Sequence, residues 1–363
     1  MKKFLAIAAF LACVAAQAAA QDWDHAVSLF NQKQTRAAIR EFHTLLKANP
    51  DAWQSWYYIG FGHYQLQEYE DTLDAFGNYV KAGAKDDKAQ ITGHYFLGWA
   101  DYQLQRYDKA IPEFTQYVAL ATKGNEKIDV TARGALGRAY IFTQKYAEAV
   151  EPLAAAAAEM KTNASNYYLL GFAHYKLNQI EPATTALNQA LTVDPKEPDA
   201  LALLTEIYFA QMKQSPTAVR QAIATGERLM QVRNDERSWA LLGQAYLFDK
   251  QYAKAAPLLD KYARLHMDSV PAWYNLGVAY SRSDQWKPAA QALEQAVKLQ
   301  PTNLAANLEL AYVYESDKQY DKALAAYQRA YDASGGKDET ARTGIDRVKQ
   351  AKPQGQEAGS RKQ

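Results

Sequence analysis

The sequence predicts an all-α protein, a solenoid of about nine stacked helical hairpins followed by a closing helix at its C-terminal end. One pattern of residues recurs along most of the 363-residue chain, and its spacing is that of helix faces. The composition, 48% hydrophobic and 22% charged, is typical of a globular protein with a large core. These observations argue against a disordered or membrane-spanning chain.

The repeat is marked by a glycine, by a small residue twelve positions later and by a large apolar residue sixteen positions later. The glycines are Gly60, Gly98, Gly137, Gly171, Gly243 and Gly277. The small residues that follow are Thr72, Ala110, Ala149, Ala183, Ala255 and Ala289, and Ala323 has the same place in the last copy. Several copies are 34 residues apart, as Gly137 and Gly171 are. Such coincident offsets predict one two-helix unit used many times.

Each copy places its apolar residues on one face of a helix. Trp239, Leu242, Gly243 and Tyr246 are separated by three, one and three residues, so they share a face that must be buried. A glycine there costs about 0.5–1 kcal/mol of helix propensity, which predicts that the small residue of the partner helix, here Ala255, comes very close. One hairpin cannot cover its own apolar face, so we expect successive hairpins to stack.

One stretch shows the pattern in full. The run WYNLGVAY at 273–280, followed by Trp286, Ala289, Leu293 and Pro301, resembles the tetratricopeptide-repeat family, whose unit is a helix, a turn and a helix of about 34 residues. The resemblance extends over nearly all of the chain after residue 20. It implies a right-handed superhelix whose first helices line a concave inner wall. It also implies that partner proteins are usually held on that wall.

The copies divide the chain into segments. We expect hairpins near 21–52, 53–90, 91–129, 130–163, 164–197, 198–235, 236–269, 270–303 and 304–335. Residues 336–352 are expected to form a capping helix, because Ala341, Ile345 and Val348 have helical spacing. Residues 353–363 contain no large apolar residue and are expected to be a flexible tail.

The first twenty residues differ from the rest and match a secretory signal peptide. Lys2 and Lys3 precede an apolar run at 4–14, and small residues lead up to Ala20. We expect cleavage after Ala20 and a periplasmic or secreted chain with no membrane-spanning helix. Two alternatives stay open: an uncleaved anchor, and a lipid on Cys13, which would make the protein an outer-membrane lipoprotein.

Charge and motifs argue against several functions. The 41 Lys and Arg residues balance 40 Asp and Glu residues, so the chain lacks the basic excess that nucleic-acid binding needs. It has no glycine-rich phosphate loop, no Gly-x-Ser-x-Gly turn and no His-Glu-x-x-His motif. We therefore expect no catalysis, no cofactor and no metal. His63 and His174 take a position that is Tyr in other copies and are expected to be packing residues.

Four arginines make the sixth copy locally basic. They are Arg220, Arg228, Arg233 and Arg237. Asp235 and Glu236 offset part of this charge, so a solvated face is expected, with an acidic partner as the alternative.

An aromatic stripe is the expected binding surface. If the packing face holds the fourth, seventh, eighth and eleventh positions of a copy, the fifth, ninth and twelfth form a neighbouring stripe at i, i+4 and i+7. The residues of this stripe are Tyr57, Phe61 and Tyr64 in the second copy, Tyr95, Trp99 and Tyr102 in the third, and Tyr168, Phe172 and Tyr175 in the fifth. Later copies carry smaller or polar residues there, such as Ala240 and Gln244.

Tyr and Trp dominate binding hot spots, which favours a groove that grips an extended or helical peptide segment. The alternative is that these rings only pack between adjacent first helices. The sequence thus predicts a non-catalytic scaffold or adaptor that binds other cell-envelope proteins. A structural subunit of a pilus, secretion or polysaccharide-export machine at the outer membrane is the alternative function.

Overall fold

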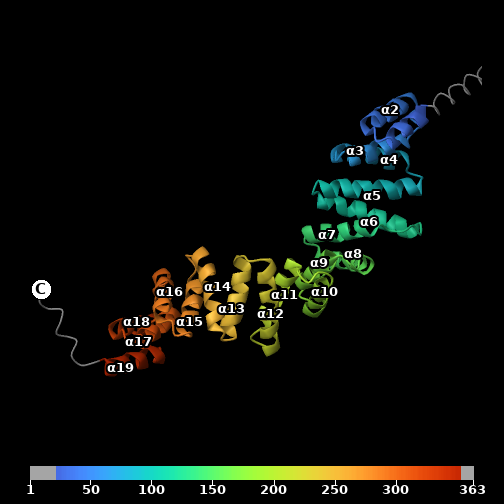
Figure 1. The fold of residues 1–363 in the computed structure, drawn as a ribbon. Coiled ribbons are helices and arrows are strands. Elements are labelled where there is room, and N and C mark those ends of the chain that lie inside the picture. The colour runs from blue at the N-terminus through green and yellow to red at the C-terminus, as the bar shows by residue number, and fades with distance from the viewer. Residues whose placement is uncertain (1–21, 353–363) are drawn as a thin grey trace, which may run out of the picture. The chain divides into compact units, whose positions relative to one another are not determined.

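The computed structural model describes residues 22–352, and these residues form helices and loops without a strand (Figure 1). The expected signal peptide at 1–20, with Cys13, and the expected tail at 353–363 lie outside the described residues. None of the helices between residues 22 and 352 combines the length and the apolar content that crossing a bilayer requires.

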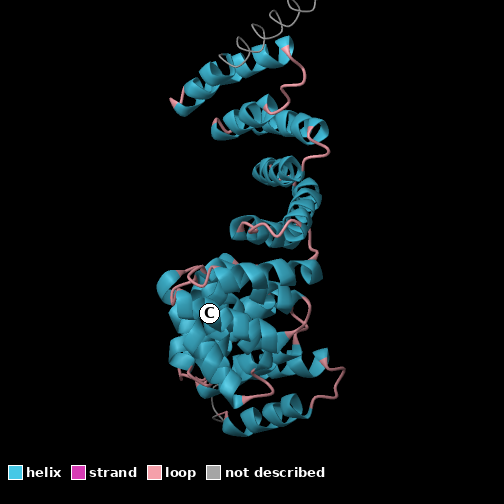
Figure 2. Ribbon diagram, turned by 90° about the vertical axis from the view of Figure 1, so that its right-hand side faces the viewer, coloured by secondary structure: helices cyan, strands magenta, loops and turns pink. Residues whose placement is uncertain are grey.

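Helices alternate as the first and second members of nine hairpins, joined by short loops (Figure 2). The first helices comprise residues 22–31, α3 (Ser55–Gln65), α5 (Asp87–Gln103), α7 (Val130–Phe142), α9 (Ala164–Lys176), α11 (Pro198–Gln211), α13 (Glu236–Phe248), α15 (Val270–Ser281) and α17 (Leu304–Ser316). The second helices are α2 (Thr35–Ala48), α4 (Tyr69–Ala82), α6 (Tyr107–Lys123), α8 (Tyr146–Glu159), α10 (Ile180–Val193), α12 (Pro216–Val232), α14 (Tyr252–Leu265), α16 (Trp286–Leu299) and α18 (Tyr320–Ala333). The last helix, α19 (Glu339–Ala351), follows the ninth hairpin, and the all-α solenoid with a capping helix is confirmed.

The chain divides into two compact units. Unit 1 ends at Asp194 and unit 2 begins at Pro195. Within each unit, every helix packs against its hairpin partner, and the second helix of one hairpin packs against the first helix of the next. Cohesion is therefore local, as expected of a repeat protein in which each hairpin covers the apolar face of its neighbour.

The repeat glycines form notches at the crossing of the two hairpin helices. A Cβ atom at Gly60 would lie 2.7 Å from Cδ2 of Phe76, and one at Gly137 would lie 2.6 Å from Cγ of Leu153. In all six copies the nearest atom belongs to the large residue sixteen positions on. The large side chain crosses the interface and fills the space left by the missing Cβ, and at Gly171 the backbone of the small residue is also close, with Ala183 O 3.1 Å from an added Cβ. The close approach predicted for the other small residues, such as Ala255, stays a prediction.

The turn between the helices of a hairpin contains a residue in the left-handed conformation. In eight of the nine hairpins this residue is not glycine, and its φ is 58–61°. The residues are Lys33, Gln67, Gln105, Gln144, Asn178, Lys250, Asp284 and Lys318. This conformation lets the chain reverse while backbone N–H groups cap the first helix, as Arg106 N does by donating to Asp101 O at 2.8 Å. The exception is the longer turn between α11 and α12, which has no left-handed residue. There the side chain of Ser215 caps the start of α12 by accepting a hydrogen bond from the Ala218 N–H.

The capping helix α19 covers the end of unit 2. Ala341 and Val348 are fully buried on its inner face. Arg347 donates two hydrogen bonds to the carboxylate of Glu315 on α17, at 2.6 and 2.7 Å. The helix is therefore held by apolar contact and by a bidentate ion pair, which is the stronger type of charged hydrogen bond.

Candidate peptide-binding surfaces

The nine residues of the aromatic stripe all lie on first helices of unit 1, and all are half-buried. Helices α3, α5 and α9 carry three each. The turn-by-turn spacing places each trio along one side of its helix. The stripe therefore presents ring edges and phenol groups that are neither fully covered nor fully free.

Rings of α3 and α5 contact one another and the core. Tyr57 stacks on Phe61 with ring centroids 5.9 Å apart. Phe61 and Tyr64 both contact Phe96, at 5.4 and 5.3 Å, and Phe96 stacks on Phe76 at 4.6 Å. Phe96 was not predicted as part of this surface. It follows the fifth position directly, as Tyr58 does in the copy before, so an aromatic sixth position was the signal.

The C-terminal half of α5 continues the ring contacts. Trp99 contacts Tyr102 at 5.6 Å and Phe114 of α6 at 5.5 Å. Tyr95 contacts Tyr117 at 5.2 Å. Burial, together with the nearby Asp129 carboxylate, raises the pKa of Tyr95 to about 12, so its phenol stays a neutral donor at physiological pH. Part of each ring thus serves packing, and the peptide-binding role of the stripe stays a prediction.

The third trio, on α9, makes fewer ring contacts than the other two. Phe172 lies 6.2 Å from Tyr168 and 6.1 Å from Tyr146 of α8, and the ammonium of Lys176 lies 5.2 Å from the Phe172 ring. Tyr175 is half-buried near the end of α9. Between this trio and the one on α5, helix α7 contributes Arg138 instead of an aromatic residue.

A polar cavity of about 190 Å³ lies between α5, α7 and α9. Its lining comprises Trp99, Tyr102, Val130, Thr131, Gly134, Ala135, Arg138, Met160, Asn163 and Asn166. Two stripe residues, Trp99 and Tyr102, therefore share a cavity with Arg138 and Asn166, which were not predicted as site residues. Arg138 occupies the ninth position of its copy, the same position as Trp99, and this was the signal available in the sequence.

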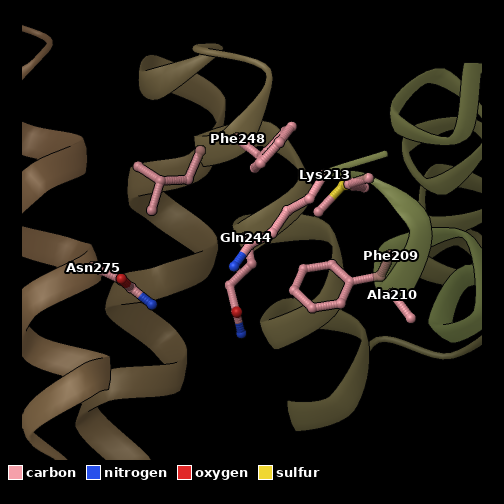
Figure 3. Close-up of a pocket in the computed structure, with 8 residues that line it drawn as sticks. Phe209, Ala210, Lys213, Gln244, Phe248 and Asn275 are labelled. Carbon is pink, nitrogen blue, oxygen red and sulfur yellow. The ribbon is translucent and has the colours of Figure 1, made fainter. Parts of the chain in front are cut away.

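Unit 2 has an apolar pocket of about 420 Å³ that the sequence did not predict (Figure 3). It is lined by Phe209, Ala210, Met212, Lys213, Gln244, Leu247, Phe248 and Asn275, which come from α11 and its C-terminal end, α13 and α15. Gln244 and Leu247 are stripe positions. Phe248 is 46% exposed at the rim. Smaller side chains at the stripe positions leave room here that the rings of unit 1 fill.

Among residues 22–352, one group of side chains could hold a metal ion. Donor atoms of His63, Glu68 and Asp71 lie within 4.8 Å of one another. Glu68 is already bonded to His63 at 2.7 Å and to Arg36 at 2.5 Å. In the fifth copy His174 makes the same contact with the uncharged amide of Gln179, at 2.6 Å. This recurrence favours a structural bond that connects the end of the first helix to the turn.

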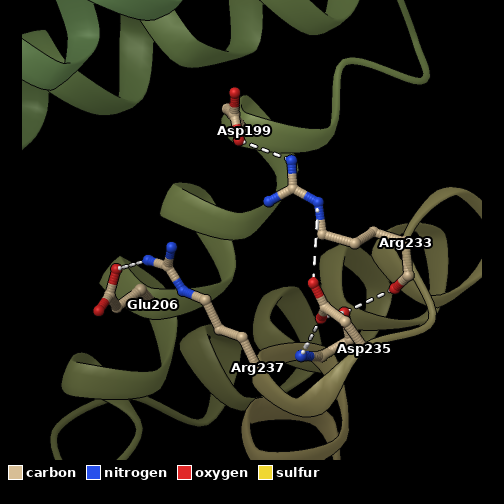
Figure 4. A network of polar contacts seen from close by, with 6 residues as sticks. Asp199, Glu206, Arg233, Asp235 and Arg237 are labelled. Atoms are coloured by element: carbon tan, nitrogen blue, oxygen red, sulfur yellow. Dashed lines mark hydrogen bonds and ion pairs between the residues drawn. The ribbon is translucent and has the colours of Figure 1, made fainter.

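The arginines of the sixth copy bind groups within unit 2 (Figure 4). Arg233 pairs with Asp199 at 2.7 Å, and Arg237 pairs with Glu206 at 2.5 Å. Arg228 donates to the carbonyl of Pro195 at 2.9 Å. These bonds connect α12 and the start of α13 to α11 and the loop before it. The basic character of this copy is thus largely used inside the unit.

Comparisons with known proteins follow the repeats. A tetratricopeptide-repeat family model matches residues 24–88, 94–165 and 274–338, more than half of the chain, and a second tetratricopeptide-repeat model matches 143–207. A model of anaphase-promoting complex, cyclosome, subunit 3 matches 215–296. A search of curated protein sequences found no match.

Several solved structures resemble the protein. YrrB, described as a TPR protein with an unusual peptide-binding site, is 18% identical, with a TM-score of 0.48 over 54% of this chain and 99% of that one. The C-terminal part of a TPR protein from Cytophaga hutchinsonii is 18% identical, with a TM-score of 0.48 over 69% and 99% of the two chains. A mutant of MamA is 23% identical, with a TM-score of 0.41 over 47% and 96%.

Proposed function

The chain belongs to the tetratricopeptide-repeat family, and from this premise we propose that it is a non-catalytic scaffold that binds other proteins of the cell envelope. Proteins of this fold generally act by holding partner proteins. The aromatic stripe of unit 1 grips a peptide segment of the partner. The protein carries out no reaction of its own.

The half-buried aromatic rings are the observation that carries this proposal. Rings such as Tyr57, Trp99 and Phe172 are anchored by packing on one side and keep another side accessible. Anchored rings lose little conformational entropy when a ligand binds, and they bury much apolar area. The phenol groups of the tyrosines add hydrogen-bond donors, so a peptide backbone can be bound as well as its side chains.

The envelope location follows from the residue pattern at 1–20, which lies outside the described residues. A second function rests on Cys13 in that segment: a lipid there would attach the protein to the outer membrane as a subunit of a larger machine. Mass spectrometry of the purified protein separates the two. A chain that begins at Gln21 supports the adaptor, and a chain that begins at a diacylated Cys13 supports the anchored subunit.

Photo-crosslinking in cells tests the groove. A crosslinking amino acid at position 57 or 99 is expected to capture one envelope protein. Position 267 in the loop between α14 and α15 of unit 2 is the control, because Met267 is 71% exposed and lies outside the first helices that carry the stripe positions. Equal capture from all three positions, or capture of no discrete partner, would contradict the proposal.

Alanine substitution separates binding from packing. Tyr57→Ala, Trp99→Ala and Phe172→Ala are expected to weaken capture of the crosslinked partner at least tenfold with a small loss of thermal stability. A large loss of stability with unchanged partner affinity would show that the rings serve packing alone.

A further inference from the structure

We infer that the turn of the second hairpin binds a divalent metal ion of the zinc type through His63, Glu68 and Asp71. His63 lies in the last turn of α3, Glu68 directly precedes α4, and Asp71 lies in the first turn of α4. None of the three belongs to the aromatic stripe. This site is therefore separate from the surface on which the proposed function rests.

The three donor atoms are close enough to share one ion. Nδ1 of His63 lies 2.7 Å from Oε2 of Glu68 and 3.9 Å from Oδ2 of Asp71, and all three atoms lie within 4.8 Å of one another. The ligand atoms of a tetrahedral zinc ion, at about 2.0–2.2 Å from the metal, are roughly 3.3–3.6 Å apart. The two measured separations lie on either side of this range, so small side-chain rotations bring the donors to it.

One imidazole nitrogen and two carboxylate oxygens favour zinc over the harder ions. Ca²⁺ and Mg²⁺ take oxygen ligands, whereas imidazole suits zinc and its neighbours. The two carboxylates carry two negative charges, and the guanidinium of Arg36 offsets one of them, so the site attracts a cation. The side chains of His63 and Glu68 are only 17% and 25% exposed, which limits screening by water. Three protein ligands leave a coordination position for water or for a partner's side chain.

Neighbouring bonds hold two of the ligands in place. The backbone N–H of Glu68 donates to the carbonyl of His63 at 2.9 Å, which fixes the turn between them. Arg36 donates to Oε1 of Glu68 at 2.5 Å, so Oε2 is the oxygen that faces His63. Hydrogen bonds of this kind orient the ligands of metal sites and increase their affinity.

The fifth copy shows which part of this arrangement is specific to the second. There His174 contacts the uncharged amide of Gln179 at 2.6 Å, and Pro182 takes the place of Asp71. The contact from the histidine to the turn is therefore shared and structural. The two carboxylates are not shared, and they are what a metal ion requires.

The remaining copies with this turn also lack the combination. Their residues at the three places are Leu29, Gln34 and Ala37; Asp101, Arg106 and Lys109; Tyr140, Lys145 and Glu148; Tyr246, Gln251 and Lys254; Tyr280, Gln285 and Pro288; and Tyr314, Gln319 and Lys322. The packing of the repeat therefore does not demand a histidine and two acids here. Their joint presence in the second copy calls for a separate reason, and a bound cation supplies one.

NMR of the histidine rings tests the site, with zinc chloride as the probe. In the ¹⁵N-labelled full chain, the ring signals of His63, assigned with His63→Gln, are expected to shift saturably with one equivalent of Zn²⁺. The ring of His174 is the internal control, because its contact is with an amide. His266, which has the single carboxylate of Glu236 at 2.7 Å, is expected to bind at least tenfold more weakly. Mg²⁺ at the same concentration is expected to leave all three rings unchanged.

Three variants give the specificity. Glu68→Gln gives the second copy the turn residue of the fifth, so it is expected to fold and to weaken zinc binding at least tenfold. Asp71→Asn is expected to weaken it at least threefold. Because Asp71 also stabilises α4 as an acid in its first turn, this variant is judged by zinc affinity and not by stability. Asp74→Asn, at an exposed carboxylate one turn further along α4, is the matched control and is expected to bind zinc unchanged. Thermal unfolding checks the fold of each variant.

Three outcomes would overturn the zinc site: full zinc affinity in Glu68→Gln, a His174 ring that shifts as strongly as that of His63, or Mg²⁺ that displaces Zn²⁺ at equal concentration. The proposed function is tested apart from this, because crosslinking at positions 57 and 99 involves none of the three ligands. Capture of a partner with no zinc binding would keep the scaffold and remove the metal site.

Discussion

Units 1 and 2 use one repeat in two ways. In unit 1 the notches of the second and third hairpins are filled by the buried rings of Phe76 and Phe114, whereas in unit 2 Leu259 and Leu293 fill them. Ring contacts in unit 1 run without a break from Trp23 to Phe142. In the described part of unit 2 the ring contacts are isolated pairs, such as Trp286 with Tyr312.

The difference shows that the space beside each repeat glycine accepts either an aromatic or an aliphatic side chain, as long as the side chain is large. In the second and third hairpins the aromatic fillers Phe76 and Phe114 contact the stripe rings Tyr57 and Trp99. In the fifth hairpin the filler is Leu187, and the stripe ring Phe172 contacts Tyr168 and Tyr146 instead. Aliphatic filling with smaller neighbours leaves an open pocket beside Phe209 and Phe248 instead. One backbone pattern therefore supports two kinds of surface, and each can be tested by changes confined to one unit.

Removing the filler residues should give the largest effects. Phe114→Ala is expected to destabilise unit 1 by about 3–5 kcal/mol, and Leu259→Ala to destabilise unit 2 by about 2–5 kcal/mol, because each leaves a cavity. Hydrogen exchange read separately for 22–194 and 195–352 measures both. Faster exchange confined to the altered unit supports two separate cores, and equal acceleration in both units would break the comparison.

Filling a notch should have the next largest effect. Gly98→Ala adds a Cβ 2.7 Å from Phe114 and is expected to cost about 1–3 kcal/mol through overpacking. Gly77→Ala in α4 is the matched control, since nothing lies within 4 Å of its added Cβ, and it should stabilise by about 0.5–1 kcal/mol. Urea denaturation measures both, and a neutral Gly98→Ala would show that the ring moves aside freely.

The buried carboxyl group of Asp101 should make the stability of unit 1 depend on pH. Asp101 takes a position that is Tyr or His in several other copies, and its Oδ1 has no hydrogen-bond partner among the described residues. Burial raises its pKa above the usual 3.8, so stability falls as pH rises from about 4 through the folded pKa. Asp101→Asn is expected to add about 1 kcal/mol at neutral pH and to flatten this slope in thermal unfolding.

The smallest effect is expected at the end of unit 2, with the opposite pH dependence. The hydrogen bonds from Arg347 lower the pKa of Glu315 below its usual 4.5. The stabilisation is therefore complete above pH 4.5 and is lost as pH falls through the lowered pKa. Glu315→Gln should cost about 0.5–1 kcal/mol at neutral pH, seen as faster exchange of α19 amides. An unchanged acid response in this variant would exclude the pair as its cause.

The hairpins and their order could be predicted from the sequence because small residues at fixed offsets mark helix crossings. The residue that contacts each glycine could not be predicted in the same way. Ala255 and Leu259 are one helical turn apart on α14, and only the angle at which the two helices cross brings Leu259 against Gly243. Phe96 was missed because its stacking partner, Phe76, belongs to the preceding hairpin. The position of one hairpin on the next depends on packing that no single copy contains.

Arg138 was missed for a related reason. Its place at the ninth position of a copy does not reveal its partners, and only the arrangement of α5, α7 and α9 shows that it forms no ion pair with a carboxylate of the described residues. The apolar pocket of unit 2 likewise arises from three first helices together. Surfaces formed by several hairpins together are thus the part of the site that the repeat pattern of the sequence predicts least well.

The left-handed turn residues have a consequence for engineering. A side chain with φ near 60° costs roughly 1–2 kcal/mol relative to the ordinary helical region, a penalty that glycine does not carry. Residues such as Lys33, Gln105 and Lys250 therefore hold strain that glycine would release. Glycine at these turns would make the protein more heat-resistant in small, additive steps, while every side chain of the stripe, the cavity and the pocket kept its identity.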